Sequence, residues 1–444
     1  MFGGSKMAGD GASGSLLRLG SEAELRFDEA NPLNAVDRRR LEAWLAALLQ
    51  TEHLALLVGN GLSSAVGHLT GTPPPHMWTH LSPPPEKALE KVRAYADKTA
   101  AGMGRTANLE DEIRAAMTLA EGFEVVGNEK AAKELRHAIT VAMTDLLQGV
   151  LDFEKGIWNE HLAASDKAKE VTDVLLQFLG PFVSRPVQRD RLHLFTTNYD
   201  RLLEYAADVL GLRLIDRFEG QLHPRFTASR LNLDVHYSPP GVRGEPRLVE
   251  GVVRYSKLHG SVDWQFHGRE ILRSTVPFGG PFLDAGVSGD ADGGKSGTAV
   301  IYPNPAKDVE TLAYPYAELF RDLAAAVCRP NTTLVTFGYG FGDGHINRVI
   351  ADMLRIPSTH LIVISRDSLP TLDDFKKRNL YPRGQTTELI GPAVGGLKEF
   401  ADLLPSLTSG HVLDAQFDYL DRRKRLDSTF EPSIENQPPA AGTN

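Results

Sequence analysis

The chain has 444 residues, 42% of them hydrophobic and 24% charged, and its formal net charge at pH 7 is -9. This composition describes a globular protein with enough chain for two packed units, and the negative charge argues against direct nucleic-acid binding as its main role. No apolar run approaches the ~20 residues of a membrane-spanning helix and no secretory signal is visible, so we expect a cytoplasmic protein without a membrane partner.

Both ends of the chain are expected to be disordered. Residues 1–20 are rich in Gly, Ser and Ala, and residues 427–444 are rich in Pro, Asn and Gly, so neither segment can bury much apolar surface. The expected folded domain is therefore residues 21–426. Its single cysteine, Cys328, excludes a disulfide framework and a multi-cysteine zinc site, so we expect no zinc and no other metal.

Helical and strand patterns alternate along most of the folded part. After a helix at 37–50, strands are expected at 54–58, 193–195, 212–215, 252–258, 298–302, 333–337 and 360–364. Helices are expected between the later strands and after them, at 199–210, 314–327, 343–354, 369–378 and 397–404. This alternation predicts an α/β fold with a doubly wound, mostly parallel Rossmann-like sheet.

A large helical insertion separates the first two strands. Residues 86–182 show no convincing strand, and helices are expected there at 88–98, 109–120, 129–147 and 167–179. Ordinary connections between a strand and a helix are much shorter. We therefore expect an inserted helical module over residues 66–190 that serves as a lid, an oligomerisation surface or both.

Four of the expected strands end in small, polar or glycine-rich turns. In chain order these turns are Gly59-Asn60-Gly61-Leu62-Ser63, Thr197-Asn198-Tyr199-Asp200, His259-Gly260-Ser261 and Gly338-Tyr-Gly-Phe-Gly-Asp343. In open α/β sheets, ligands bind at the edge where the strands have their carboxyl ends. If the strands lie side by side, the four turns should meet in one crevice.

Each turn also has a purely structural interpretation. A glycine pair after a strand is about as often plain turn chemistry as a phosphate site. Asn198 and Asp200 suit a helix cap, as does Asp343, and His259 could be a hydrogen-bonded structural histidine. The residues alone leave these alternatives open.

Taken together, the turns resemble those of the bacterial sirtuin-like NAD hydrolases of antiphage defence. Thr196-Thr-Asn-Tyr-Asp200 parallels the sirtuin motif Thr-Gln-Asn-Ile-Asp, and Leu258-His-Gly260 and Gly338-Tyr-Gly-Phe-Gly-Asp-Gly-His-Ile-Asn347 are similar to segments of that group. The resemblance spans about residues 51–405. It implies that Asn198 positions the water or a ribose hydroxyl and that His259 is the general base. It also implies contacts with NAD from Gly59, Asn60, Gly61, Ser63, Thr197, Asp200, Gly338 and Ser365.

The resemblance also implies a function. The expected enzyme is an NAD+ glycohydrolase that forms nicotinamide and ADP-ribose and depletes cellular NAD on infection, as a homo-oligomer with a HerA-type ATPase partner. The chain lacks the four-cysteine zinc module and the Ile-Pro-Asp-Phe-Arg segment of the histone deacylases. A protein deacylase or ADP-ribosyltransferase and a non-enzymatic nucleotide-sensing module stay as alternatives.

One further motif points elsewhere. Gly289-Asp-Ala-Asp-Gly-Gly-Lys-Ser296 satisfies the phosphate-loop pattern letter by letter. That loop must follow a strand and open a helix, whereas here the expected strand at 298–302 comes after it. We therefore expect a mobile surface loop at residues 289–296 instead of a triphosphate site.

Overall fold

The computed structural model describes residues 14–28, 30–75, 80–82, 86–102, 105–185, 189–228, 233–237, 247–267, 270–280 and 315–405. The expected strand at 298–302, the phosphate-loop-like motif and the expected C-terminal tail at 427–444 lie outside these residues. None of the helices within the described ranges is long and apolar enough to cross a membrane.

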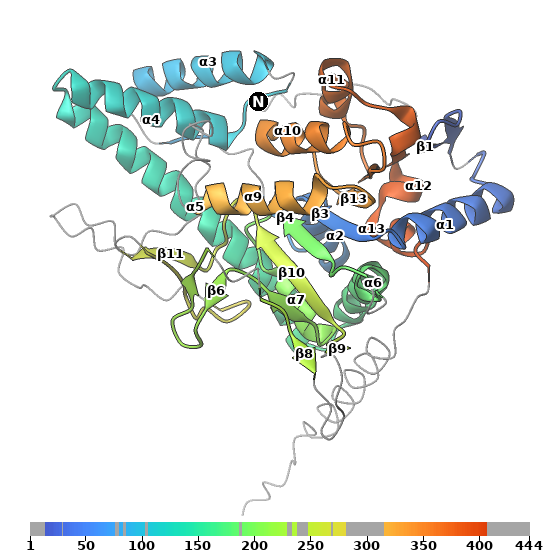
Figure 1. The fold of residues 1–444 in the computed structure, drawn as a ribbon. Helices are drawn as coiled ribbons and strands as arrows, with labels where there is room; N and C mark the ends of the chain where they lie inside the picture. The colour runs from blue at the N-terminus through green and yellow to red at the C-terminus, as the bar shows by residue number, and fades with distance from the viewer. Residues whose placement is uncertain are drawn as a thin grey trace, which may run out of the picture.

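A nine-stranded sheet forms the centre of the fold (Figure 1). From one edge to the other its strands are β2 (Leu25–Phe27), β1 (Ser15–Leu19), β15 (Thr386–Ile390), β14 (His360–Ser365), β13 (Thr332–Phe337), β3 (His53–Val58), β4 (His193–Thr196), β10 (Val252–Lys257) and β5 (Arg213–Ile215). The strands from β15 to β5 are parallel, while β1 and β2 are antiparallel to their neighbours. The predicted α/β class with a mostly parallel sheet is confirmed.

The strand order creates a switch point beside β3. The chain runs outward from β3 to β4 and β10, and later returns to place β13 on the opposite side of β3. Val58 lies opposite both Phe337 and Thr196, and Thr196 lies opposite Lys257, so the four strands end level with one another. A ligand crevice is expected at such a point.

Helices cover both faces of the sheet, which explains why its central strands are apolar throughout. Within β3, Leu54 and Leu56 belong to one core, and Ala55 and Leu57 belong to the core on the opposite face. The first core is closed by α1 (Ala35–Leu49), α2 (Gly61–Thr70), α6 (Asp166–Val183), α7 (Leu202–Val209), α12 (Pro392–Gly395) and α13 (Leu397–Ala401). The second is closed by α9 (Tyr316–Val327), α10 (Gly344–Met353) and α11 (Pro370–Arg378).

The helices between β3 and β4 divide into two groups. Three of them, α3 (Glu86–Gly102), α4 (Leu109–Val125) and α5 (Glu129–Leu162), share a core of their own and form an arm beside the sheet (Figure 1). By contrast, α2, α6 and the last part of α5 pack on the sheet. The arm starts α4 with a capping box in which Asn108 and Asp111 bond each other's backbone. The predicted boundaries of the helical module, residues 66–190, stay a prediction. Within that range, α3, α4 and α5 of the arm share a hydrophobic core that is separate from the cores of the sheet.

Several short elements complete the described fold. A four-stranded sheet contains β11 (Trp264–His267), β12 (Glu270–Arg273), β7 (Arg225–Phe226) and β6 (Phe218–Glu219), and a two-stranded sheet contains β8 (His236–Tyr237) and β9 (Arg247–Leu248). A 3-10 turn, η2, covers Arg383–Gln385. The sequence pattern did not predict these elements, because strands of two to four residues are too short to show a period.

The expectation of disorder over residues 1–20 is wrong for Ser15–Leu19. These residues form β1, which pairs with β15, and both Leu17 and Leu19 are buried. Between them the buried Arg18 lies 2.5 Å from the Glu388 carboxylate of β15. Pairing with a distant strand therefore gives this segment the burial that its own composition does not suggest.

A buried histidine next to β15 makes the stability depend on pH. The Nε2 atom of His360 lies 2.8 Å from the Thr387 hydroxyl, and burial together with the nearby Arg18 lowers the pKa of His360 from 6.5 to about 4. Between these values the unfolded chain binds a proton that the folded chain does not bind. We expect the free energy of unfolding to fall by up to about 3 kcal/mol as the pH falls from 6.5 to 4.

Urea unfolding of the wild type and of His360→Gln at pH 7 and pH 4.5 checks this expectation. The glutamine cannot titrate, so the variant should lose less stability than the wild type between the two pH values. An equal loss in both proteins would show that His360 does not cause the pH dependence.

Candidate functional site

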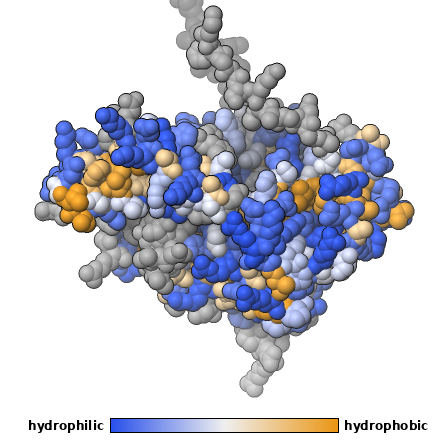
Figure 2. Space-filling model, turned by 90° about the horizontal axis from the view of Figure 1, so that it is seen from above, coloured by the Kyte–Doolittle hydropathy of each residue, from blue (hydrophilic) through white to orange (hydrophobic). Residues whose placement is uncertain are grey.

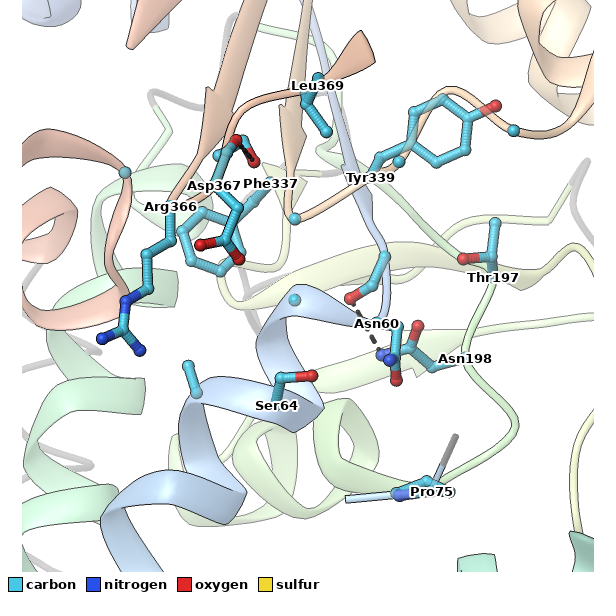
Figure 3. A pocket seen from close by; sticks show the side chains of 18 of the residues that line it. Asn60, Ser64, Pro75, Thr197, Asn198, Phe337, Tyr339, Arg366, Asp367 and Leu369 are labelled. Atoms are coloured by element: carbon cyan, nitrogen blue, oxygen red, sulfur yellow. Dashed lines mark hydrogen bonds between the residues drawn. The ribbon is translucent and has the colours of Figure 1, made fainter. Parts of the chain in front are cut away.

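A cavity of about 1250 Å³ lies at the carboxyl ends of β3, β4, β10, β13 and β14. The turns after these strands form one part of its wall (Figure 3). Its size exceeds the ~300–1,000 Å³ of most small-molecule sites and leaves room for a dinucleotide. The structure brings nine of the ten predicted site residues to this cavity, namely Gly59, Asn60, Gly61, Thr197, Asn198, Asp200, His259, Gly338 and Ser365.

The glycines of two turns allow the backbones of these turns to touch. A Cβ atom on Gly59 would lie 2.5 Å from the Gly338 carbonyl oxygen, and one on Gly61 would lie 2.5 Å from the Gly338 Cα. Gly338 itself has a φ of +60°, which L side chains rarely adopt. Close packing between the β3–α2 and β13–α10 turns is thus one reason for these glycines. The start of α2, which has no side-chain cap and no acidic residue in its first turn, also faces the cavity and favours an anion there.

We expect Gly338→Ala to lower the free energy of unfolding by about 2–4 kcal/mol, because the new methyl group would meet backbone atoms at a positive φ. Gly340→Ala is the matched control, since a Cβ atom at Gly340 would have no heavy atom within 4 Å. Denaturant unfolding of the two variants measures the difference. Equal stabilities would contradict the tight approach of the two turns.

Asn198 is held by a short hydrogen-bond chain. Its Nδ2 group donates to the Gly59 carbonyl at 3.1 Å and to the Ser63 hydroxyl at 2.9 Å, and the Ser63 hydroxyl donates to the Asp200 carboxylate at 2.6 Å. The side chain of Asn198 lies beside the turn after β3 (Figure 3). Because both Nδ2 hydrogens have partners, Oδ1 is left as an acceptor for a ligand hydroxyl or a water.

Hydrogen bonds with α7 and with Lys257 of β10 also hold the turn that contains Asn198. Asp200 Oδ1 accepts from the Leu202 N–H at 3.1 Å, so α7 begins at Leu202 and not at Tyr199 as expected. Lys257, almost fully buried, donates to the Asp200 carbonyl and lies 3.2 Å from Glu204. Asp200 therefore accepts from the first backbone N–H of α7, although the cap residue of this helix is Arg201, and the Asp200 side chain also reaches the cavity.

Ser63 is the one predicted site residue that does not line the cavity. Its side chain is fully buried beneath the turn after β4, where it joins Asn198 to Asp200. The neighbouring Ser64 lines the cavity instead (Figure 3). In this arrangement Ser63 positions Asn198 without facing the ligand space.

His259 is paired with a carboxylate from another turn. Its Nε2 atom lies 2.8 Å from Asp343 Oδ2, and the two side chains are 16% and 5% exposed. A carboxylate can only accept, so Nε2 is the ring nitrogen that donates in this contact. The sequence predicted Asp343 only as a helix cap, because nothing along the chain links it to a histidine 84 residues away.

The helical arm supplies another wall of the cavity, which the sequence motifs missed. Arg105 and Glu110 line it, and Arg105 is held by Asp111 at 2.9 Å. The Tyr199 hydroxyl donates to Glu110 at 3.2 Å, and burial raises the pKa of Tyr199 well above its usual value, so the phenol stays protonated. The arm thus contacts the residue directly after Asn198.

Two charged residues after β14 were also missed. Arg366 and Asp367 are exposed, line the cavity and follow Ser365, whose hydroxyl donates to the Asp367 carbonyl at 2.8 Å (Figure 3). An acidic residue after a strand of such a sheet can bind ribose hydroxyls. Its position after the predicted strand at 360–364 was the signal that could have identified Asp367. Among the residues that the structure describes, no group of three or more His, Cys, Asp and Glu side chains is arranged to hold a metal ion.

Comparison with known proteins gives one family match. Residues 192–383 match the family model of the SIR2-like domain. A comparison with curated proteins found no match. The matched span contains β4, β10, β13 and β14 and with them Asn198, His259 and Ser365, whereas β3 and the helical arm lie before it. The matched residues make up less than half of the chain, and a SIR2-like domain there fits, in general terms, an activity that involves NAD.

Proposed function

We propose that the chain is an NAD+ glycohydrolase that cleaves NAD+ to nicotinamide and ADP-ribose. The main observation behind this proposal is that Asn198 and His259 line the same cavity at the ends of two neighbouring strands. Asn198 offers a fixed amide oxygen, and His259 offers a nitrogen that can accept a proton. An acceptor and a base are what the hydrolysis of an N-glycosidic bond requires of the protein.

The proposed step needs no general acid, because the nicotinamide ring is a cation in NAD+ and becomes a neutral molecule when it leaves. The bond between ribose C1′ and the pyridinium nitrogen breaks, its electron pair stays on that nitrogen, and an oxocarbenium-like ribose develops. A water oriented by Asn198 Oδ1 bonds to C1′ and gives its proton to His259 Nδ1. The proton then passes to solvent, so the balance is NAD+ plus water giving nicotinamide, ADP-ribose and H+.

In this proposal the remaining predicted residues bind the other parts of NAD. The pyrophosphate lies near the start of α2, where the dipole favours an anion. The adenosine ribose lies near Ser365 and Asp367, at the end of β14. The residues proposed to contact NAD are Gly59, Asn60, Gly61, Thr197, Asp200, Gly338 and Ser365, with Ser63 acting through Asn198.

Release of nicotinamide with and without an acyl-lysine peptide tests the reaction class. A glycohydrolase releases nicotinamide at the same rate in both samples, because water is its acceptor. A deacylase or transferase would need the added acceptor, and a nucleotide-sensing module would bind NAD without releasing nicotinamide. Either of these two outcomes would overturn the proposal.

We further propose that the enzyme acts in the cytoplasm as an antiphage effector that depletes NAD, as a homo-oligomer with a HerA-type ATPase partner. The motif resemblance supports the defence role. An apolar patch on the outer end of the arm, visible in Figure 2, supports assembly; Val125 and Val126 at the end of α4 are 87% and 74% exposed. Light scattering of the purified chain checks the assembly, and a monomer would argue against it.

A further inference from the structure

The pair between His259 and Asp343 assigns Asp343 a role beyond capping a helix. We propose that Asp343 is a positioning residue that holds His259 as the tautomer with a proton on Nε2 and a free lone pair on Nδ1. This inference rests on the proposed NAD cleavage, because it concerns the base of that reaction. It makes the turn after β13 part of the catalytic apparatus.

The two oxygens of the Asp343 carboxylate have different partners. Oδ1 accepts from the backbone N–H groups of His345 at 2.8 Å and Ile346 at 3.4 Å, while Oδ2 faces His259. Because α10 fixes Oδ1, the direction of Oδ2 is fixed as well. The histidine ring is thereby tied to a helix end that is rigidly packed on the sheet.

The backbone before Asp343 is held in an uncommon conformation. Phe341 is a buried non-glycine residue with a φ of +50°. The centroid of its ring lies 5.0 Å from that of Tyr339 and 5.5 Å from that of Phe375. The Tyr339 hydroxyl donates to the Asp343 carbonyl at 3.3 Å. Such a conformation persists only where packing enforces it, and here the packing places the Asp343 carboxylate against His259.

Asparagine separates the two roles of this residue. Its side-chain oxygen caps a helix about as well as aspartate, so Asp343→Asn should keep α10 intact. Its amide group can only donate toward Nε2, which favours the opposite tautomer with the proton on Nδ1. That tautomer has no free lone pair at the nitrogen where the proposed reaction needs it.

The first test is the steady-state kinetics of Asp343→Asn with NAD+. We expect kcat to fall by about 10²–10⁴-fold, the usual contribution of a general base, with KM changed less than about threefold and the melting temperature unchanged. Asp352→Asn is the matched control, because Asp352 is on the same helix with its side chain 56% exposed. A drop in melting temperature that accounts for the lost activity, or unchanged kcat, would overturn the positioning role.

A double-mutant cycle with His259→Ala tests whether Asp343 acts through the histidine. If it does, Asp343→Asn should change the residual turnover of His259→Ala by less than about twofold. Multiplicative losses would mean that Asp343 acts independently of His259, and the inference would fail.

The tautomer itself can be observed without any enzymatic assay. In ¹⁵N-histidine NMR spectra at pH 8.5, His259 is identified by the signal missing from His259→Gln. We expect an Nε2-protonated ring in the wild type and an Nδ1-protonated ring in Asp343→Asn. An Nδ1-protonated ring in the wild type overturns the inference even if NAD is cleaved, whereas the expected tautomer without NAD cleavage overturns only the proposed function.

Discussion

Asn198→Ala and His259→Ala are each expected to reduce NAD+ cleavage to a small residual rate and to leave the fold intact. Without the Asn198 amide no fixed acceptor orients the water, and without His259 no base takes its proton. Loss of a general base alone costs about 10²–10⁴-fold in rate. Chromatographic measurement of nicotinamide release gives the turnover, and thermal unfolding of each variant confirms that it is folded.

His137→Ala is the control for this pair, because His137 is an exposed residue of the arm. It should keep the wild-type rate. Near-wild-type turnover in folded Asn198→Ala and His259→Ala would remove both residues from the mechanism.

The second large effect concerns stability, and it arises where α5 meets the turn after β4. The side chain of Glu154 is fully buried, and its two oxygens lie 2.5 Å from the Arg201 guanidinium and 2.8 Å from the Arg201 N–H. Burial raises the pKa of Glu154, and the Arg201 partner opposes that rise. We expect Glu154→Ala to lower the free energy of unfolding by about 3–5 kcal/mol, because the buried Arg201 charge loses its partner.

Denaturant unfolding measures this change, with Glu160→Ala as the control on the same helix. Glu160 lies 3.9 Å from Lys167 in a partly exposed pair, which should contribute at most about 1 kcal/mol. Arg201 also donates to the carbonyls of Val276 and Pro277. If these carbonyls replace the lost carboxylate, Glu154→Ala will resemble the control, and the pair will have been shown not to anchor α5.

The central strands were predictable, whereas the strands at one edge were not. The runs at 54–58, 193–195, 252–258 and 333–337 are apolar because helices cover both faces of the sheet, and each ends in a turn that marks its carboxyl end. In contrast, β1 and β15 each carry one member of the buried Arg18–Glu388 pair. A charged residue within a short run interrupts the apolar pattern that predicts a strand. The partner that neutralises Arg18 is Glu388, which is 370 residues away along the chain.

The part of the site that follows from the order of the strands in the sheet was predictable from the sequence. Turns at level strand ends must lie together, so nine of the ten predicted residues reach one cavity. Ser63 does not, because its position in the first turn of α2 directs it under the cavity toward Asn198. The partners that orient His259 and contact Tyr199 come from other elements, α10 and α4, and no local pattern joins them to the motifs.

Product analysis of NAD+ incubated with the purified 444-residue chain, alone and with its candidate ATPase partner, tests the proposed cleavage most directly. We expect nicotinamide and ADP-ribose in equal amounts from the wild type in at least one of the two samples, and neither product from an Asn198→Ala/His259→Ala double variant. Intact NAD+ in every wild-type sample, or the same products from the double variant, would contradict it.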